Sequence, residues 1–152
     1  MWSEFLAHSA LNRNTNFPLE CASPYQAFAG PCTEMYLYEI AAATIGVTVV
    51  GSNPIHGGGS GSTRPDYCTG LDSRYMGEVA YAAAGTKREN ANEMVKELLA
   101  KYEDRIKSRS APIGKKFQEC YDTKTITPSK EYLELYQKIK NELENKGLEF
   151  KY

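Results

Sequence analysis

The run Met35–Ile45 constrains the fold more than any other part of this chain. Its residues, MYLYEIAAATI, are apolar on nearly every face of a helix, and Glu39 is the exception. A helix of this kind has to be covered by other elements on more than one side. The run therefore predicts a helix near the centre of the fold.

Extended segments are expected on both sides of this helix. Leu19–Phe28 reads as extended because Pro24 restricts the residue before it to β or polyproline conformations. Ala29-Gly30-Pro31 predicts a corner, and Glu34 then falls in the first helical turn, where a carboxylate meets the positive end of the helix dipole. The β-branched run Val47–Val50 is typical of a buried parallel strand. Together they predict a βαβ unit, whose strand-to-helix connections carry the active sites of barrels.

Length and charge exclude several classes of protein. A chain of 152 residues is one domain by prior, and its 18 basic and 19 acidic residues do not steer it toward nucleic acid or an anionic membrane. No apolar run approaches the roughly 20 residues that a membrane helix needs. The first residues lack the basic start and apolar core of a signal peptide, so a cytoplasmic protein is expected.

The cysteines favour reduced thiols over a metal site. Cys21, Cys32, Cys68 and Cys120 include no C-x-x-C pair, and only two histidines accompany them. Zinc sites usually show closely spaced pairs of ligands. Buried, reduced cysteines are therefore the expectation, with no bound metal.

Helical spacing returns at both ends of the chain. Trp2, Phe5 and Leu6 lie on one face of a helix that the run Asn12–Asn16 is expected to end. This helix begins without a cap, so the sequence suggests that further structure precedes it.

The second half is predicted to be mainly helical. Asp72 is expected to cap a helix, Thr86–Glu89 reads as a capping box for the next helix, and Thr127 with Pro128 begins the last one. Gly147 is expected to close it, with Leu148 folding back. We therefore divide the single segment 1–152 into strand and helix units (1–50), a glycine-rich loop (51–71) and C-terminal helices (72–152).

The glycine-rich loop contains fragments of two enzymatic motifs. His56-Gly57-Gly58-Gly59 is similar to an esterase oxyanion hole, but the G-x-S-x-G elbow and a later histidine are missing. A phosphate-binding loop needs a lysine after its glycines, and no lysine occurs before Lys87. We expect a mobile loop at the carboxyl end of a strand instead.

Two strands are too few for the helices that accompany them. Parallel sheets are normally covered on both faces and have several strands. The chain therefore either completes a larger sheet or folds mainly as a helical cluster.

Several longer words in the sequence point to a known family. They are Ala29–Met35 (AGPCTEM), Arg74–Ala80 (RYMGEVA) and Gly114–Asp122 (GKKFQECYD), followed by Lys124-Thr125, Thr127-Pro128 and Glu131-Tyr132. In these words the chain resembles the C-terminal part of the monomethylamine methyltransferases of methanogenic archaea. The resemblance covers about 27–150, nearly all of this chain but roughly the last third of the family's sequence.

The resemblance implies a fold and an activity. The family fold is a TIM (β/α)8 barrel, so the chain would be an α/β protein: the helix-rich C-terminal portion of a barrel, incomplete by itself. Members transfer a methyl group from methylamine to the cobalt of a corrinoid on a separate protein, and an oligomer is expected. Their reactive pyrrolysine would lie upstream of Met1, which leaves no catalytic residue and no directly bound cofactor in this segment.

The resemblance also implies a substrate pocket next to the corner. The family uses a Gln and a Tyr there, and an ungapped match places them at Pro24 and Gln26. Tyr25 and Gln26 supply the same two side-chain types in a shifted order, which needs a backbone bulge to face the same side. We predict Tyr25 and Gln26 as substrate-binding residues and His56 as a contact for the corrinoid protein.

Other roles for the chain and for its carboxylates remain open. A split or decayed relative that binds a partner protein, without catalysis, is the alternative function. Glu34 is expected to be a helix-start carboxylate rather than a base. Glu39 and Glu78 are expected to cap a helix or to pair with an arginine.

Overall fold

The computed structural model describes residues 2–16, 20–21, 27–54 and 64–151. Its helices are α1 (Trp2–Asn14), α2 (Glu34–Val49), α3 (Gly70–Ala83), α4 (Arg88–Ala100), α5 (Glu103–Lys107), α6 (Phe117–Cys120) and α7 (Lys130–Glu144). Its strands are β1 (Glu20–Cys21), β2 (Asn53–Pro54), β3 (Tyr121–Asp122) and β4 (Thr127–Pro128).

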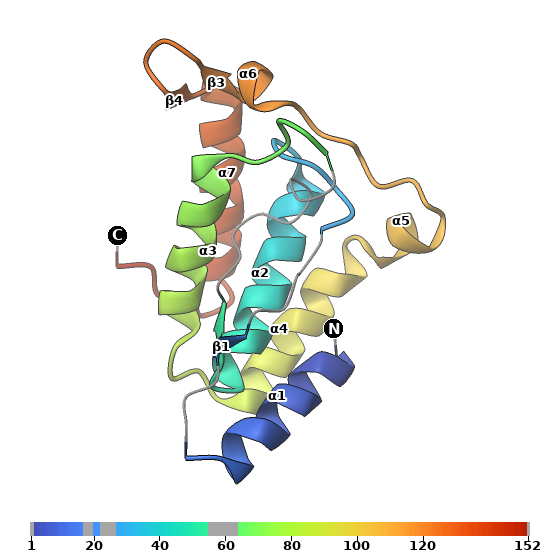
Figure 1. Ribbon diagram of the computed structural model, residues 1–152, viewed down its shortest axis with the longest axis vertical. Helices are drawn as coiled ribbons and strands as arrows, with labels where there is room; N and C mark the ends of the chain where they lie inside the picture. The colour runs from blue at the N-terminus through green and yellow to red at the C-terminus, as the bar shows by residue number, and fades with distance from the viewer. Residues whose placement is uncertain (1, 17–19, 22–26, 55–63, 152) are drawn as a thin grey trace.

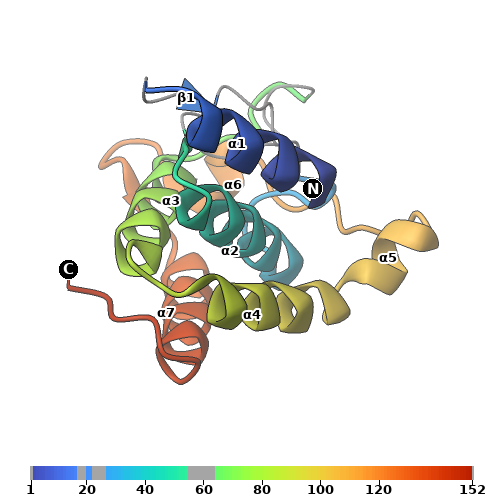
Figure 2. The same ribbon diagram turned by 90° about the horizontal axis from the view of Figure 1, so that it is seen from below.

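Helix α2 lies at the centre, as its sequence predicts. Helices α1, α3, α4 and α7 surround it (Figures 1 and 2). Every residue of α2 from Met35 to Val47 is buried, and this one helix supplies much of the continuous apolar core. Burial of its all-round apolar surface is the main stabilising term that the chain can obtain.

The two strands next to α2 are parallel neighbours. Glu20 pairs with Asn53 and Cys21 with Pro54, so β1, α2 and β2 form the expected strand, helix and strand unit. The prediction of a strand at Val47–Val50 is wrong, because α2 continues through Val49 and the chain turns at Gly51 (φ +87°). Val47 is buried against Phe5 of α1, and this tertiary burial outweighs the modest β preference of valine.

Two predicted helix starts are displaced along the chain. Thr69 caps α3, and Asp72 is the partner three residues later in a reciprocal capping box, so the prediction of Asp72 as the cap is wrong. Lys87 precedes α4 and makes no capping hydrogen bond through its side chain, which excludes the predicted capping box at Thr86–Glu89.

The last helix also starts later than predicted. Ser129 caps α7, whereas Thr127-Pro128 forms β4 and pairs with Tyr121–Asp122 in an antiparallel ladder. At its other end the prediction is confirmed: Gly147 has φ +98°, and Leu148 folds back to 2% exposure.

The long amphipathic helix expected after residue 88 is broken at Lys101 and Tyr102. Lys101 Nζ donates to the Tyr38 hydroxyl (3.0 Å) and pairs with Glu142 of α7, so it does not form the predicted surface pair with Glu97. Glu97 pairs with Lys146 instead. These ties fasten α2, α4 and α7 to one another.

No helix within the described ranges is both long and apolar enough to cross a membrane.

Candidate functional site

The predicted pocket residues Tyr25 and Gln26, and the predicted partner contact His56, lie outside the described residues. Their roles stay predictions. The structure does describe the segment that follows Gln26 directly, residues 27–33, which we call the corner. The corner enters α2, and three sets of contacts fasten it.

The first set comes from Glu39 in the second turn of α2. Its side chain is 1% exposed, and its two carboxylate oxygens accept hydrogen bonds from the backbone N–H groups of Phe28 (3.1 Å) and Ala29 (3.0 Å). The expectation of capping or of an arginine partner is therefore wrong for Glu39. Burial raises the pKa of Glu39 to about 7, even though the two backbone hydrogen bonds favour the ionised form.

The second set comes from residues 111–117, which we call the strap. Gly30 N–H donates to the Pro112 carbonyl (3.0 Å), and Lys115 N–H donates to the Pro31 carbonyl (2.9 Å). Between these bonds the two backbones cross so closely that a Cβ on Gly30 would stand 1.7 Å from the Ile113 carbonyl oxygen. Only glycine fits at this crossing.

The strap also reaches the residues that follow the glycine-rich loop. Phe117 N–H donates to the Asp66 carbonyl at 2.7 Å. The strap thus joins the corner after β1 to the segment after β2, which are the two connections that the sequence analysis associates with function. The word match Gly114–Asp122 contains half of this strap, but its spacing alone gave no sign of the crossing.

The third set is a pair of buried thiols. Cys32 of the corner and Cys120 of α6 hydrogen bond to each other through their side chains, and both are free cysteines. Burial raises the pKa of Cys120 to about 12 and also raises that of Cys32, so both thiols are protonated at neutral pH. Cys68 is free but exposed, so the expectation of buried thiols holds only for the first two.

A buried carboxylate lies beside the corner. Asp72 is fully buried, and it accepts hydrogen bonds from the hydroxyls of Tyr132 and Tyr36 and from Thr69 N–H (2.9 Å). Burial raises the pKa of Asp72 to about 6, against the effect of these hydrogen bonds. Asp72 thereby connects α2, α3 and α7, a role that its capping position in the sequence did not reveal.

The remaining carboxylates singled out in the sequence have structural roles. Glu78 pairs with Arg74 (2.7 Å) and with the half-buried ammonium of Lys140 (3.1 Å), which confirms the expected arginine partner. Glu34 is the first residue of α2 and pairs with Lys138 on the surface, in agreement with a helix-start carboxylate. Within the described residues, no group of His, Cys, Asp and Glu side chains is arranged to hold a metal ion.

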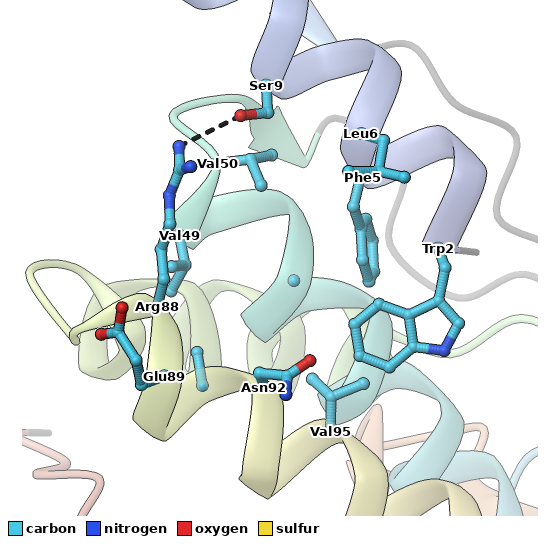
Figure 3. Close-up of a pocket in the computed structure, with 12 residues that line it drawn as sticks. Trp2, Phe5, Leu6, Ser9, Val49, Val50, Arg88, Glu89, Asn92 and Val95 are labelled. Atoms are coloured by element: carbon cyan, nitrogen blue, oxygen red, sulfur yellow. Dashed lines mark hydrogen bonds between the residues drawn. The ribbon is translucent and has the colours of Figure 1, made fainter.

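An apolar cavity of about 380 Å³ lies at the other end of α2 from the corner (Figure 3). Helices α1, α2 and α4 line it, with Trp2, Phe5, Leu6, Val49 and Val95 among its walls. At its rim the Arg88 guanidinium donates to the Ser9 hydroxyl (3.1 Å). The cavity follows the seam along which α1 packs on α2.

Replacing Gly46 with alanine is expected to loosen this seam. A Cβ at position 46 would stand 2.1 Å from the Phe5 ring, so α1 has to move outward, at a cost of roughly 1–3 kcal/mol. Trp2 packs edge-on against Phe5 and is the only tryptophan, so its fluorescence reports the displacement of α1. Adding Phe5→Ala should restore the seam in part, and an unchanged Trp2 signal in the single variant would contradict the expectation.

The described residues thus form a fastened frame around the predicted pocket segment. The frame consists of Glu39, the Gly30 and Gly114 crossing, and the thiol pair. Its groups are protonated thiols and a carboxylate bonded to backbone N–H groups. Their chemistry is that of positioning a segment.

Known proteins share this sequence and this arrangement. A family model described as monomethylamine methyltransferase MtmB matches residues 3–148. Monomethylamine methyltransferase MtmB2 of Methanosarcina barkeri is 44% identical over 127 residues, and MtmB of Methanosarcina mazei is 43% identical over the same length. Each match covers 83% of this chain and 27% of the relative.

Two solved structures match in the same way. The crystal structure of the Methanosarcina barkeri monomethylamine methyltransferase and that of the hydroxylamine MtmB complex both give a TM-score of 0.72 at 42% identity. Each covers 83% of this chain and 27% of the solved one. The chain therefore spans about a quarter of the length of the relatives it matches. With the family model matching nearly its whole length, this chain belongs to the monomethylamine methyltransferase family.

Proposed function

We propose that this chain acts as the C-terminal segment of a methyltransferase that moves a methyl group from monomethylamine to the cobalt of a corrinoid carried by a separate protein. The observation that carries the proposal is the family match over residues 3–148. The bond between nitrogen and the methyl carbon breaks, and a bond between carbon and cobalt forms. The electrophilic group that captures the amine belongs to the part of the relatives that this chain does not match.

The fold has the parts expected of a barrel's last units. Helix α1 leads to β1, and α2 connects β1 to a parallel β2, which α3 follows. A parallel sheet of two strands needs further strands beside it. In our proposal the remainder of a (β/α)8 barrel supplies them, and the segment contributes one wall of the barrel.

Substrate and partner contacts are assigned to the ends of the strands. Tyr25 and Gln26 bind the amine, since they immediately precede the fastened corner. His56 contacts the corrinoid protein from the glycine-rich loop. The assembled enzyme is an oligomer that works in the cytoplasm.

A second function is favoured by one observation. The apolar core runs without interruption from Ala27 through α3, α4 and α7 to Leu148, so these helices pack around α2 without help from a barrel. Such a cluster suits a non-catalytic module that binds a partner protein. Co-purification with a corrinoid protein, detected by its visible absorbance, would favour the methyltransferase over this module.

A hybrid enzyme tests the leading proposal. The matching C-terminal part of the Methanosarcina barkeri relative is replaced by residues 3–148 of this chain, and methyl transfer from monomethylamine to a corrinoid protein is measured by the absorbance of cobalt. We expect the hybrid to be active and the relative truncated before this segment to be inactive. A folded hybrid that is inactive with every methylated amine, beside an active intact relative, would refute the proposal.

A further inference from the structure

We propose that Glu39 is a positioning residue of the amine pocket, which holds the backbone after Gln26 so that Tyr25 and Gln26 are presented in one orientation. This inference rests on the proposed function, which places the pocket pair at these two positions. It names the side chain that fixes the pair from outside the pocket.

Glu39 grips two successive peptide groups with its two oxygens. The N–H groups of Phe28 and Ala29 point at Oε1 and Oε2, at 3.1 Å and 3.0 Å. Two successive N–H directions fix the rotation of the backbone about its own axis. In an extended segment this rotation decides which face each preceding side chain takes, because side chains alternate.

The strap holds the same corner from the next residues onward. Gly30 and Pro31 are bonded to the strap, so Glu39 and the strap together fix four consecutive residues. The strap begins to act after Ala29, however. Of these two devices, only Glu39 acts on the residues nearest Gln26.

Glu39 lacks the compensation that a buried carboxylate usually has. Burial and the two backbone hydrogen bonds are the causes of its pKa shift, and no cation contributes. The group that faces it from α4 is Tyr102, a buried and neutral phenol, which supplies no charge. Burying an unpaired carboxylate costs stability, so a merely structural position would be better filled by an apolar side chain.

The first arm of the test uses the chain itself. Amide hydrogen exchange at residues 25–29 is measured by NMR in the wild type, in Glu39→Gln and in the control Glu34→Gln, which alters an exposed carboxylate of the same helix. We expect exchange at these residues to be about tenfold faster in Glu39→Gln, because one of two charge-assisted hydrogen bonds is lost, with α3 and α7 unchanged. Unchanged exchange at residues 25–29 would overturn the inference.

A second variant guards against loss of folding. Glu39→Asp keeps the charge but shortens the side chain by one methylene, so it loosens the grip without a change of charge. If Glu39→Gln does not fold, Glu39→Asp is expected to show the same local increase in exchange. Exchange equal to that of the wild type in Glu39→Asp would then overturn the inference.

The second arm uses the hybrid enzyme. We expect Glu39→Gln to raise the KM for monomethylamine about tenfold with little change in kcat, since it disturbs binding and not the transfer step. The pH profile of kcat/KM should also lose a limb in that variant, which a purely structural role would not produce. An unchanged KM and profile in an active hybrid would overturn the inference. An inactive unsubstituted hybrid would refute the proposed function instead, and the exchange measurement would still decide the role of Glu39.

Discussion

Replacing Gly30 with alanine is expected to lower the free energy of unfolding by about 3 kcal/mol, because the new methyl group has no space. It would stand 1.7 Å from the carbonyl oxygen of Ile113 and 2.6 Å from its carbonyl carbon. Both are backbone atoms, so the strap has to move away and the hydrogen bond from Gly30 N–H to the Pro112 carbonyl is lost. Urea unfolding followed by circular dichroism measures the effect.

Gly77→Ala is the matched control for this prediction. A Cβ on Gly77 meets nothing within 4 Å, and the residue lies inside α3. Alanine there should stabilise the chain by roughly 0.5–1 kcal/mol, since glycine is a poor helix former. If Gly30→Ala and Gly77→Ala had the same stability, the close crossing of corner and strap would be disproved.

Stability is expected to fall as the pH rises from about 4.5 to 7, with Glu39 as the largest single cause. The pKa of Glu39 is about 7 in the folded chain against an ordinary 4.5, so the folded state binds more protons than the unfolded state in this window. A difference of this size corresponds to roughly 3 kcal/mol, at about 1.4 kcal/mol per pH unit. Its contribution is complete below pH 4.5 and is lost as the pH passes the folded pKa.

Asp72 acts with the same sign in a lower window. Its pKa of about 6, against an ordinary 3.8, makes its contribution fade between these two values. Glu78 and Glu142 have lowered pKa values and therefore act oppositely, below the ordinary pKa of a glutamate. The chain should thus be most stable in mildly acidic solution.

Unfolding in urea at a series of pH values between 4.5 and 8 tests this expectation. Glu39→Gln should flatten the slope near pH 7, and Glu34→Gln, on the same helix but exposed, should leave it as it is. Equal slopes for the wild type and Glu39→Gln would mean that Glu39 does not titrate as its burial requires.

The outline of the fold could be predicted from local patterns. The run Met35–Ile45 specified a helix covered on all sides, because no other arrangement buries so many apolar residues. The strand, helix and strand order and the stop at Gly147 followed from equally local rules. The longer words around Gly30 and Gly114 identified the family, which the match over residues 3–148 confirms.

The tertiary structure decided what local rules leave nearly balanced. Val47–Val50 has the composition of a strand, yet burial against Phe5 keeps Val47 in α2. Thr127-Pro128 looks like a helix start, yet it pairs with Tyr121–Asp122. Differences in propensity are a few tenths of a kcal/mol per residue, whereas burying one large side chain contributes roughly 1.5–3 kcal/mol.

The candidate site divides along the same line. The sequence by itself determined the family and the segment that carries the predicted pocket pair. Only the tertiary structure showed that Glu39 binds the backbone of Phe28 and Ala29, and that Gly30 crosses the strap. Such contacts join residues that are distant in sequence, and a buried polar atom takes whichever partner the packing brings within reach. No pattern along the chain specifies that partner.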